Sequence, residues 1–173
     1  MDWRTARASY DRFASRYDAI FETLQAPKIR AIRALMGPEP PEEPVVDLGA
    51  GTGLFSRLTG LSCIEIDASA EMLRRPRRAA CVQSRLDRLP LADASVGTLV
   101  AVTSLIDYAP GDPEPQEWAR VLRPGGRLLL SVMLRENLAA IDAALANAGF
   151  EAGGQVVVGQ DRAGVWALRM RPR

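Results

Sequence analysis

The chain contains no histidine and only two cysteines, and both shortages limit its chemistry. Cys63 and Cys81 lie in apolar stretches and do not form a Cys-x-x-Cys pair. This argues against a metal site or a disulfide framework, and we expect two reduced thiols in the core. Without histidine, a general base must be a carboxylate or a tyrosine, unless the reacting group arrives as a competent nucleophile.

Lysine and long apolar runs are equally scarce. Lys28 is the only lysine, and acids and bases nearly balance at a formal charge of +1. Composition therefore favours no nucleic acid as the main partner. No run approaches the ~18 apolar residues of a membrane span, and the N-terminus lacks a signal core. We expect a cytoplasmic protein without stable membrane insertion.

The length of 173 residues, with 47% apolar and 25% charged residues, predicts one globular domain over residues 1–173. Its first part has apolar residues at steps of three, four and seven, which predicts an amphipathic helix. The residues of this stripe are Trp3, Tyr10, Phe13, Tyr17, Ile20, Phe21 and Leu24. A second helix near Lys28 to Met36 completes an N-terminal helical lid over residues 1–36. The proline-rich segment 37–44 then leads into the core, residues 44–173.

Apolar runs and helical patterns alternate through the core. We expect strands at 45–48, 63–67, 79–83, 97–105, 126–134, 155–159 and 164–170. Helices are expected after Gly53, from Ser69 to a stop at Pro76, and over 115–122 and 136–148. This alternation predicts an α/β fold with a parallel sheet covered on both faces.

The segment VVDLGAGTGLF, residues 45–55, places glycines at the first turn from strand to helix, where ligands bind in such sheets. A nicotinamide or flavin fingerprint would need glycine where Leu54 stands, and the lysine of a phosphate loop is absent. Asp47 would repel a pyrophosphate but hold an ammonium group. Asp67, at the end of the second strand, can accept hydrogen bonds from ribose hydroxyls. Together these features indicate S-adenosylmethionine.

Six segments in order resemble a known family. They are YDRFASRYD (10–18), VVDLGAGTG (45–53), IDASAEML (66–73), LPLADAS (89–95), RVLRPGGRLLLSV (120–132) and NAGFE (147–151). The chain resembles a class I S-adenosylmethionine-dependent methyltransferase of the small type that includes the ubiquinone and menaquinone biosynthesis methyltransferases. The resemblance implies a Rossmann-like, seven-stranded, mostly parallel sheet with the last strand antiparallel. It also implies methyl transfer from S-adenosylmethionine, without a metal.

The resemblance also implies the cofactor contacts. These residues are Tyr17, Asp47, Gly49, Ala50, Gly51, Asp67, Ala68, Met72, Arg85, Leu86 and Thr103. Asp67 would hold the ribose, Thr103 would lie near the sulfonium, and Tyr17 would cover the carboxylate end or the methyl group. The sequence departs from the family at Arg85, because the family usually has there an acid that meets the adenine amine. Asp87 follows two residues later.

The candidates for catalysis are Tyr17, Asp107 and Tyr108, with Tyr10 as a further tyrosine. Each also has a structural interpretation. Tyr10 and Tyr17 can belong to the apolar stripe of a helix, and Asp107 and Tyr108 can belong to a polar turn. A thiolate, an amine or an acidic phenol would suit this set better as methyl acceptor than an aliphatic alcohol. The leading helix would be the lid that excludes water.

The acceptor region is short, because no helix is inserted after the strand at 126–134. An open site is compatible with a bulky acceptor, with a pocket completed by a homodimer or partner subunit, or with loss of activity. We expect transfer of a methyl group to a small-molecule acceptor. The alternatives are a non-catalytic S-adenosylmethionine-binding regulatory or partner subunit, and an enzyme whose leading helix rests on a lipid surface.

Overall fold

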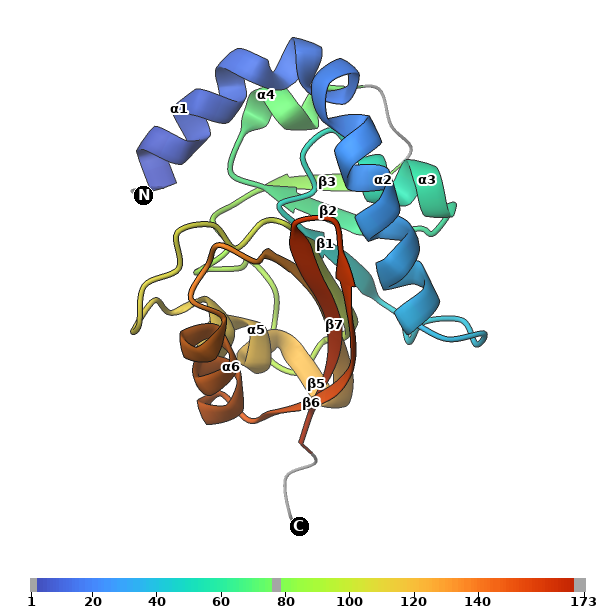
Figure 1. Cartoon of the computed structure of the whole chain (residues 1–173), viewed down its shortest axis with the longest axis vertical. Helices are drawn as coiled ribbons and strands as arrows, with labels where there is room; N and C mark the ends of the chain where they lie inside the picture. Colours follow the sequence, from blue (N-terminus) through green and yellow to red (C-terminus); the bar gives the residue numbers. More distant parts are fainter. Residues whose placement is uncertain (1–2, 76–78, 170–173) are drawn as a thin grey trace.

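The computed structural model describes residues 3–75 and 79–169 and contains a seven-stranded sheet (Figure 1). The strands are β1 (Val45–Leu48), β2 (Ile64–Asp67), β3 (Ala80–Gln83), β4 (Val96–Val102), β5 (Leu122–Met133), β6 (Phe150–Val158) and β7 (Asp161–Leu168). Their order is β3-β2-β1-β4-β5-β7-β6. Strands β1 to β5 pair in parallel, whereas β7 is antiparallel to β5 and β6. The expected fold is confirmed.

Helices cover both faces of the sheet. They are α1 (Trp3–Phe13), the 3-10 turn η1 (Ala14–Arg16), α2 (Tyr17–Leu35), α3 (Leu54–Thr59), α4 (Ala70–Leu73), α5 (Glu114–Val121) and α6 (Leu138–Asn147). One buried apolar cluster joins α2 and α3 to one face, and a second joins α5 and α6 to the other (Figure 1). Coverage on both sides explains why β4 is apolar and buried almost without interruption.

The N-terminal helices differ from expectation. We expected one helix through Leu24 and a second near Lys28 to Met36, but the chain breaks at η1, and α2 runs through Pro27. Proline removes one helical hydrogen bond. Burial of Ile29 and Ile32 against the sheet compensates for that loss, because tertiary packing supplies most helical stability.

The apolar stripe is also only partly buried. Phe13 and Ile20 are 46% and 47% exposed, so these two residues of the stripe add little to the cover of a lid. Cys63 is buried as expected, but Cys81 is exposed because β3 forms an edge of the sheet. Neither cysteine is part of a disulfide. The expected helix stop at Pro76 lies outside the described residues.

Candidate active site

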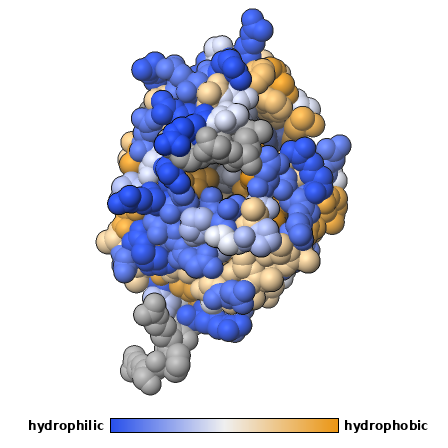
Figure 2. Space-filling model, turned by 90° about the vertical axis from the view of Figure 1, so that its left-hand side faces the viewer, coloured by the Kyte–Doolittle hydropathy of each residue, from blue (hydrophilic) through white to orange (hydrophobic). Residues whose placement is uncertain are grey.

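A cavity of about 900 Å³ lies where β1, β2 and β4 end, between these ends and the N-terminal helices. The side of the molecule that faces left in Figure 1 is hollowed, with hydrophobic residues at the bottom of the hollow and hydrophilic side chains around it (Figure 2). In parallel sheets ligands bind beyond the carboxyl ends of the strands, so this position is the one expected for the site.

The turn after β1 brings bare backbone to the cavity. Gly49 has φ 69°, and a Cβ there would lie 2.4 Å from the Cβ of Ser104, so the turn packs directly on the chain after β4. Gly51 has φ 56°, and the nearest atom to its missing Cβ is a backbone oxygen 4.0 Å away. Gly53, at φ 79°, starts α3. Gly49 therefore allows the turn to pack closely on Ser104, whereas Gly51 leaves room for a ligand.

Asp67 joins this turn to the next loop. One carboxylate oxygen accepts a hydrogen bond of 2.8 Å from the N–H of Gly51, and the other accepts one of 2.8 Å from Ser69 N–H. Ser69 in turn caps α4 by accepting from Met72 N–H. Since an ionised carboxylate can accept several hydrogen bonds, the same group can receive ligand hydroxyls in the cavity. Asp47 is buried below, in a smaller hollow shared with Gly49, Ala50, Gly51 and Tyr17.

Ala68, Met72, Arg85 and Leu86 also line the cavity. The Arg85 guanidinium makes a two-pronged ion pair with Asp87, in which Nε lies 2.8 Å from one carboxylate oxygen and Nη2 contacts the other. The charge of Arg85 is therefore balanced within its own loop. Arg85, where the sequence departs from the family pattern, is thus paired with an acid two residues later in the chain.

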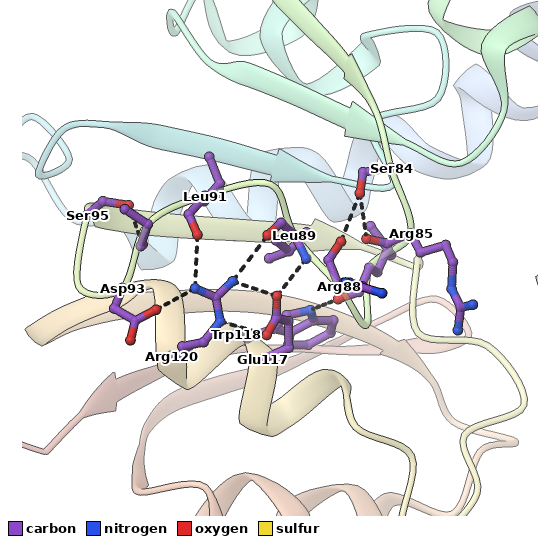
Figure 3. Close-up of polar contacts among 12 residues, drawn as sticks. Ser84, Arg85, Arg88, Leu89, Leu91, Asp93, Ser95, Glu117, Trp118 and Arg120 are labelled. Atoms are coloured by element: carbon purple, nitrogen blue, oxygen red, sulfur yellow. Dashed lines mark hydrogen bonds and ion pairs between the residues drawn. The ribbon is translucent and has the colours of Figure 1, made fainter.

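A polar clamp built on α5 holds this loop, residues 84–95 (Figure 3). The Arg120 guanidinium donates to the backbone oxygens of Leu89 and Leu91 at 3.1 and 2.9 Å, and both oxygens of Glu117 accept from it. These hydrogen bonds hold the pKa of Glu117 below its usual value. Trp118 Nε1 donates to the oxygen of Leu86 at 3.0 Å. The backbone of the loop beside the expected adenine position is thus held by side chains of α5.

Aromatic rings from α1 and α2 close the other side of the cavity. The centroid of the Tyr17 ring lies 6.4 Å from that of Tyr10 and 4.9 Å from that of Phe21. Burial raises the pKa of Tyr17 to about 12, and it also raises the pKa of Tyr10. Both hydroxyls therefore remain protonated near neutral pH and can donate a hydrogen bond to a ligand, while the Tyr17 oxygen accepts one of 3.4 Å from Gln25 Nε2.

Polar contacts place these helices on the loops below. Asp11 accepts from Ser69 Oγ at 2.5 Å, and Asp18 accepts from Thr52 Oγ1 at 2.5 Å. Arg57 adds an ion pair of 3.1 Å with Asp18. The start of the chain thus contacts both the turn after β1 and the start of α4.

The structure brings the expected cofactor residues together, but not all of the catalytic candidates. Thr103 lines the cavity at the end of β4 with φ 53°, a left-handed backbone that ends the strand. Asp107 is exposed and does not line the cavity. Tyr108 is buried in the apolar cluster under α5 and α6, away from the lining. The polar turn that we considered for this region is formed by the residues after Tyr108, where Ala109 N–H donates to Asp112 Oδ2 and Asp112 N–H donates to Ala109 O.

Sequence reasoning missed a polar network in the cavity wall. Asp161, at the start of β7, pairs with Lys28 Nζ at 2.8 Å and accepts from Thr103 Oγ1 at 2.8 Å and Ser131 Oγ at 3.2 Å. Lys28 also donates to Thr103 at 3.2 Å, and Gln25 lies 3.4 Å from the same hydroxyl. The one feature of the sequence that could have pointed to this network is that Lys28 is the only lysine of the chain.

Residues 46–130 match the family described as methyltransferase domain. With the fold and the cavity, this defines a Rossmann-like methyltransferase. The chain belongs to the class I S-adenosylmethionine-dependent methyltransferases. Across residues 3–75 and 79–169, no helix is long and apolar enough to cross a membrane, and no group of three or more metal-ligating side chains was found.

Curated relatives carry different names. The chain is 36% identical over 142 residues to a Micromonospora griseorubida protein named as a candidate 23S rRNA (guanine-N(1)-)-methyltransferase, covering 72% of the chain and 46% of that protein. It is 34% identical over 148 residues to the malonyl-[acyl-carrier protein] O-methyltransferase of Methylococcus capsulatus, covering 79% and 51%. It is 32% identical over 136 residues to the demethylmenaquinone methyltransferase of Mycolicibacterium paratuberculosis, covering 73% and 59%. The chain thus spans about half the length of these relatives.

Solved structures share the fold over nearly the whole chain. A chain in the complex between the Haloferax volcanii Trm112 methyltransferase activator and a candidate methyltransferase superposes with a TM-score of 0.78 at 19% identity, covering 92% of this chain and 97% of its own. A Thermotoga maritima S-adenosylmethionine-dependent methyltransferase, described as a possible histamine N-methyltransferase, gives 0.76 at 17% identity, covering 94% and 99%. At these identities the likeness concerns the fold alone.

Proposed function

We propose that this chain is an S-adenosylmethionine-dependent methyltransferase that acts on a small-molecule acceptor. The observation that carries the proposal is the convergence on one cavity of Asp67, the glycine turn and Thr103, which come from the ends of three different strands. A chain without a ligand for this cavity would have no need to keep an acid, bare backbone and an aromatic cover together there.

The residues present fit the cofactor. The space beside Gly51 is open, and the Asp67 carboxylate faces the same cavity, so a ribose could bind the carboxylate while the rest of the molecule crosses the glycine turn. Met72 and Leu86 offer apolar surface for a base. Buried Asp47 lies under the turn and supplies negative charge for the ammonium of the methionine part.

When bound, S-adenosylmethionine supplies an electrophilic methyl group carried on a sulfonium. The protein then has to bind the acceptor in line with that group and exclude water, and positioning of this kind can lower a barrier by roughly 7–11 kcal/mol. Tyr10, Tyr17 and Phe21 form the apolar cover that excludes water. In this assignment Tyr17 is a donor and a cover, not a base, because its pKa is raised to about 12.

The acceptor is proposed as a small molecule because the site is a cavity and the chain has a formal charge of only +1. Its named relatives include one whose name specifies 23S rRNA and others whose names specify malonyl-[acyl-carrier protein] or demethylmenaquinone. Since the chain spans about half of their length, none of these substrates transfers directly. Methylation of labelled RNA by the purified protein is the outcome that would favour the rRNA alternative.

A regulatory or partner subunit that does not catalyse transfer by itself is the second candidate, and the complex of one solved neighbour with a methyltransferase activator makes a need for a partner worth testing. In that case the acceptor site would be completed by a partner or by a second copy. Size-exclusion chromatography with light scattering, followed by a methyl-transfer assay on the monomer, distinguishes a self-sufficient enzyme from a chain that needs a partner.

Calorimetry tests the proposal directly. S-adenosylmethionine and S-adenosylhomocysteine should bind the purified protein, whereas nicotinamide dinucleotides should not. Transfer of radiolabelled methyl from the first to an extract of small metabolites then tests catalysis. Binding of dinucleotides without a response to either sulfur compound would refute the cofactor assignment, and binding without transfer would favour the non-catalytic alternative.

A further inference from the structure

The network of Lys28, Thr103, Ser131 and Asp161 joins four elements, α2, β4, β5 and β7, at the cavity wall. Asp161 is 1% exposed and the Lys28 side chain is 13% exposed. All except Ser131 line the cavity, beside the position expected for the transferring methyl group. A buried ion pair at this position is more than a surface contact, because each partner needs the other to remain charged.

Both oxygens of Asp161 contact the network. One oxygen lies 2.8 Å from Lys28 Nζ in an ion pair but accepts no hydrogen bond from the described residues, and the other accepts from Thr103 and Ser131. Removing this carboxylate would leave the buried ammonium of Lys28 without its counter-charge, which is strongly unfavourable. The Thr103 hydroxyl donates to Asp161 at 2.8 Å. Asp161 therefore holds Lys28 in the cavity wall.

The charged side chains beside Asp161 in the cavity lining are the cations Lys28 and Arg135. An ammonium has three N–H donors, and Lys28 donates one of them to Thr103 Oγ1 at 3.2 Å while its charge is paired with Asp161. The Arg135 guanidinium is 68% exposed and 3.7 Å from Glu136. The Tyr17 hydroxyl stays protonated. Lys28 and Arg135 therefore favour a ligand that presents hydrogen-bond acceptors at this end.

The other acids of the cavity lining belong to different parts of it. Asp67 is held by Gly51 and Ser69 on the turn side. Asp87 is paired with Arg85, and Glu114 interacts with these two residues. A cationic amine that entered beside Lys28 would thus meet two cations and a carboxylate whose charge is already paired with Lys28. This end of the cavity selects against positive charge.

We infer that the methyl acceptor carries an ionised oxygen group, a carboxylate or an acidic phenol or enol, which Lys28 Nζ binds beside the methyl group. The inference rests on the proposed function and names its substrate class. Lys28 is a binding residue for the acceptor in this assignment, and Asp161 is the positioning residue that holds its ammonium toward the cavity. An acceptor already ionised in solution also fits a chain without histidine, since no base is required to remove its proton.

Four probes that share a 4-nitrophenyl group and differ in charge test the preference for anions. They are the anions 4-nitrobenzoate and 4-nitrophenolate, the neutral 4-nitrobenzamide and the cation 4-nitrobenzylammonium. Binding is measured at pH 8 by equilibrium dialysis against protein saturated with S-adenosylhomocysteine. We expect at least one anion to bind about tenfold more tightly than the amide, as for a hydrogen bond to a charged group, and the ammonium to bind most weakly. Which anion binds better tells a carboxylate acceptor from a phenolic one.

Variants separate binding from folding. Asp161→Asn keeps hydrogen-bonding atoms but frees the charge of Lys28, so it should tighten binding of the anions. Lys28→Met/Asp161→Asn removes both charges together and should abolish the preference for anions without leaving a buried ion alone. Arg30→Met removes a positive charge from an exposed position of the same helix and should change nothing. A purely structural ion pair would instead give weaker or equal anion binding in Asp161→Asn.

Equal binding of all four probes, no binding of either anion, or an anion preference that survives in the double variant overturns the inference. S-adenosylhomocysteine affinity is measured on the same samples. If that compound binds and the anion preference is absent, only the substrate class is wrong. If S-adenosylhomocysteine does not bind, the proposed function itself is wrong.

Discussion

The N–H of Gly51 lies 2.8 Å from a carboxylate oxygen of Asp67, so the glycine turn and the end of β2 are joined directly. The carboxylate thereby organises two loops besides facing the cavity. Removing it should disturb ligand binding in two ways, through the lost ribose contact and through the loosened turn.

Asp67→Ala should weaken binding of S-adenosylhomocysteine by tenfold or more, since hydrogen bonds to a charged group contribute ~1.5–3 kcal/mol each. Arg85→Ala should have a smaller effect, because the Arg85 guanidinium is already engaged by Asp87. Calorimetric titration of both variants gives the ranking. The reverse order would show that Arg85, not Asp67, is the main anchor of the ligand.

Gly49→Ala should destabilise the protein more than Gly51→Ala. Both positions have positive φ, which disfavours alanine by roughly 1–2 kcal/mol. Only at Gly49 would the new methyl group also collide, at 2.4 Å, with the Cβ of Ser104. Ser104→Gly should therefore rescue part of the loss in Gly49→Ala and nothing in Gly51→Ala. Thermal denaturation of the four variants tests this coupling, and its absence would contradict the close packing of turn and strand end.

The buried thiol of Cys63 should make stability fall at alkaline pH. Burial, followed by the nearby Asp47 carboxylate, raises its pKa from 9.0 to about 12. The folded chain keeps a proton that the unfolded chain loses, so this stabilisation is complete below pH 9 and disappears as pH rises toward 12. Each pH unit in that window removes about 1.36 kcal/mol for one proton.

Cys63→Ala should accordingly flatten the dependence of Tm on pH between 8 and 11. It should be less stable than the natural chain at pH 8, because a buried sulfur is lost, and the difference should shrink as pH rises. Cys81→Ala, at an exposed position, is the matched control and should follow the natural chain. A constant difference across the range would show that the thiol does not titrate as described.

Arg120→Met should release the loop 84–95 and lower both stability and ligand affinity. The side chain bonds to two backbone oxygens and to Glu117 (Figure 3). Loss of even one such charged bond, ~1.5–3 kcal/mol, corresponds to a Tm decrease of roughly 3–12 °C for a chain of this size. Arg169→Met removes an exposed arginine whose side chain pairs with exposed Glu151 at 3.0 Å and should have little effect. Comparable losses in the two variants would rule out a special role for the clamp.

The predicted parts of the cavity lining are local. The turn at Gly49 to Gly53, the acid that ends β2 and the helix that follows Ser69 each lie within a few residues of the strand that positions them, so their places in the fold follow from spacing. Lys28 and Asp161 are 133 positions apart and meet only because β7 returns beside β5 under α2. No local pattern contains such a contact.

Two further differences have the same origin. The break at η1 was hidden because the apolar stripe has helical spacing on both sides of it. Tyr108 was a candidate because tyrosine can serve as a base, but it is buried in the apolar cluster that includes residues of α5 and α6. In both cases tertiary packing decided between alternatives that the local sequence allows.

The last prediction concerns closure of the cavity. We expected the whole leading helix to act as a lid, and the contacts of α2 now refine that expectation. Lys28 ties α2 to β7, and Asp18 ties its first turn to Thr52 and Arg57. Among the described residues, α1 packs on α4 and not on the sheet as α2 does, and one polar tie of α1 to the cavity loops is Asp11 to Ser69. We therefore expect α1 to move about the break at η1 while α2 stays in place.

Hydrogen exchange with and without S-adenosylhomocysteine tests this directly. Amides of α1 should exchange quickly in the free protein and become protected when the ligand binds, whereas those from Lys28 to Leu35 should be protected in both states. Asp11→Asn weakens the tie to Ser69 and should speed exchange in α1 alone, while Arg30→Met serves as a control on α2. Deleting residues 1–13 should leave a folded sheet that binds the ligand poorly, because Tyr10 is lost from the cover. Equal protection of α1 with and without ligand would mean that it is a fixed part of the fold, and that water is excluded by some other element.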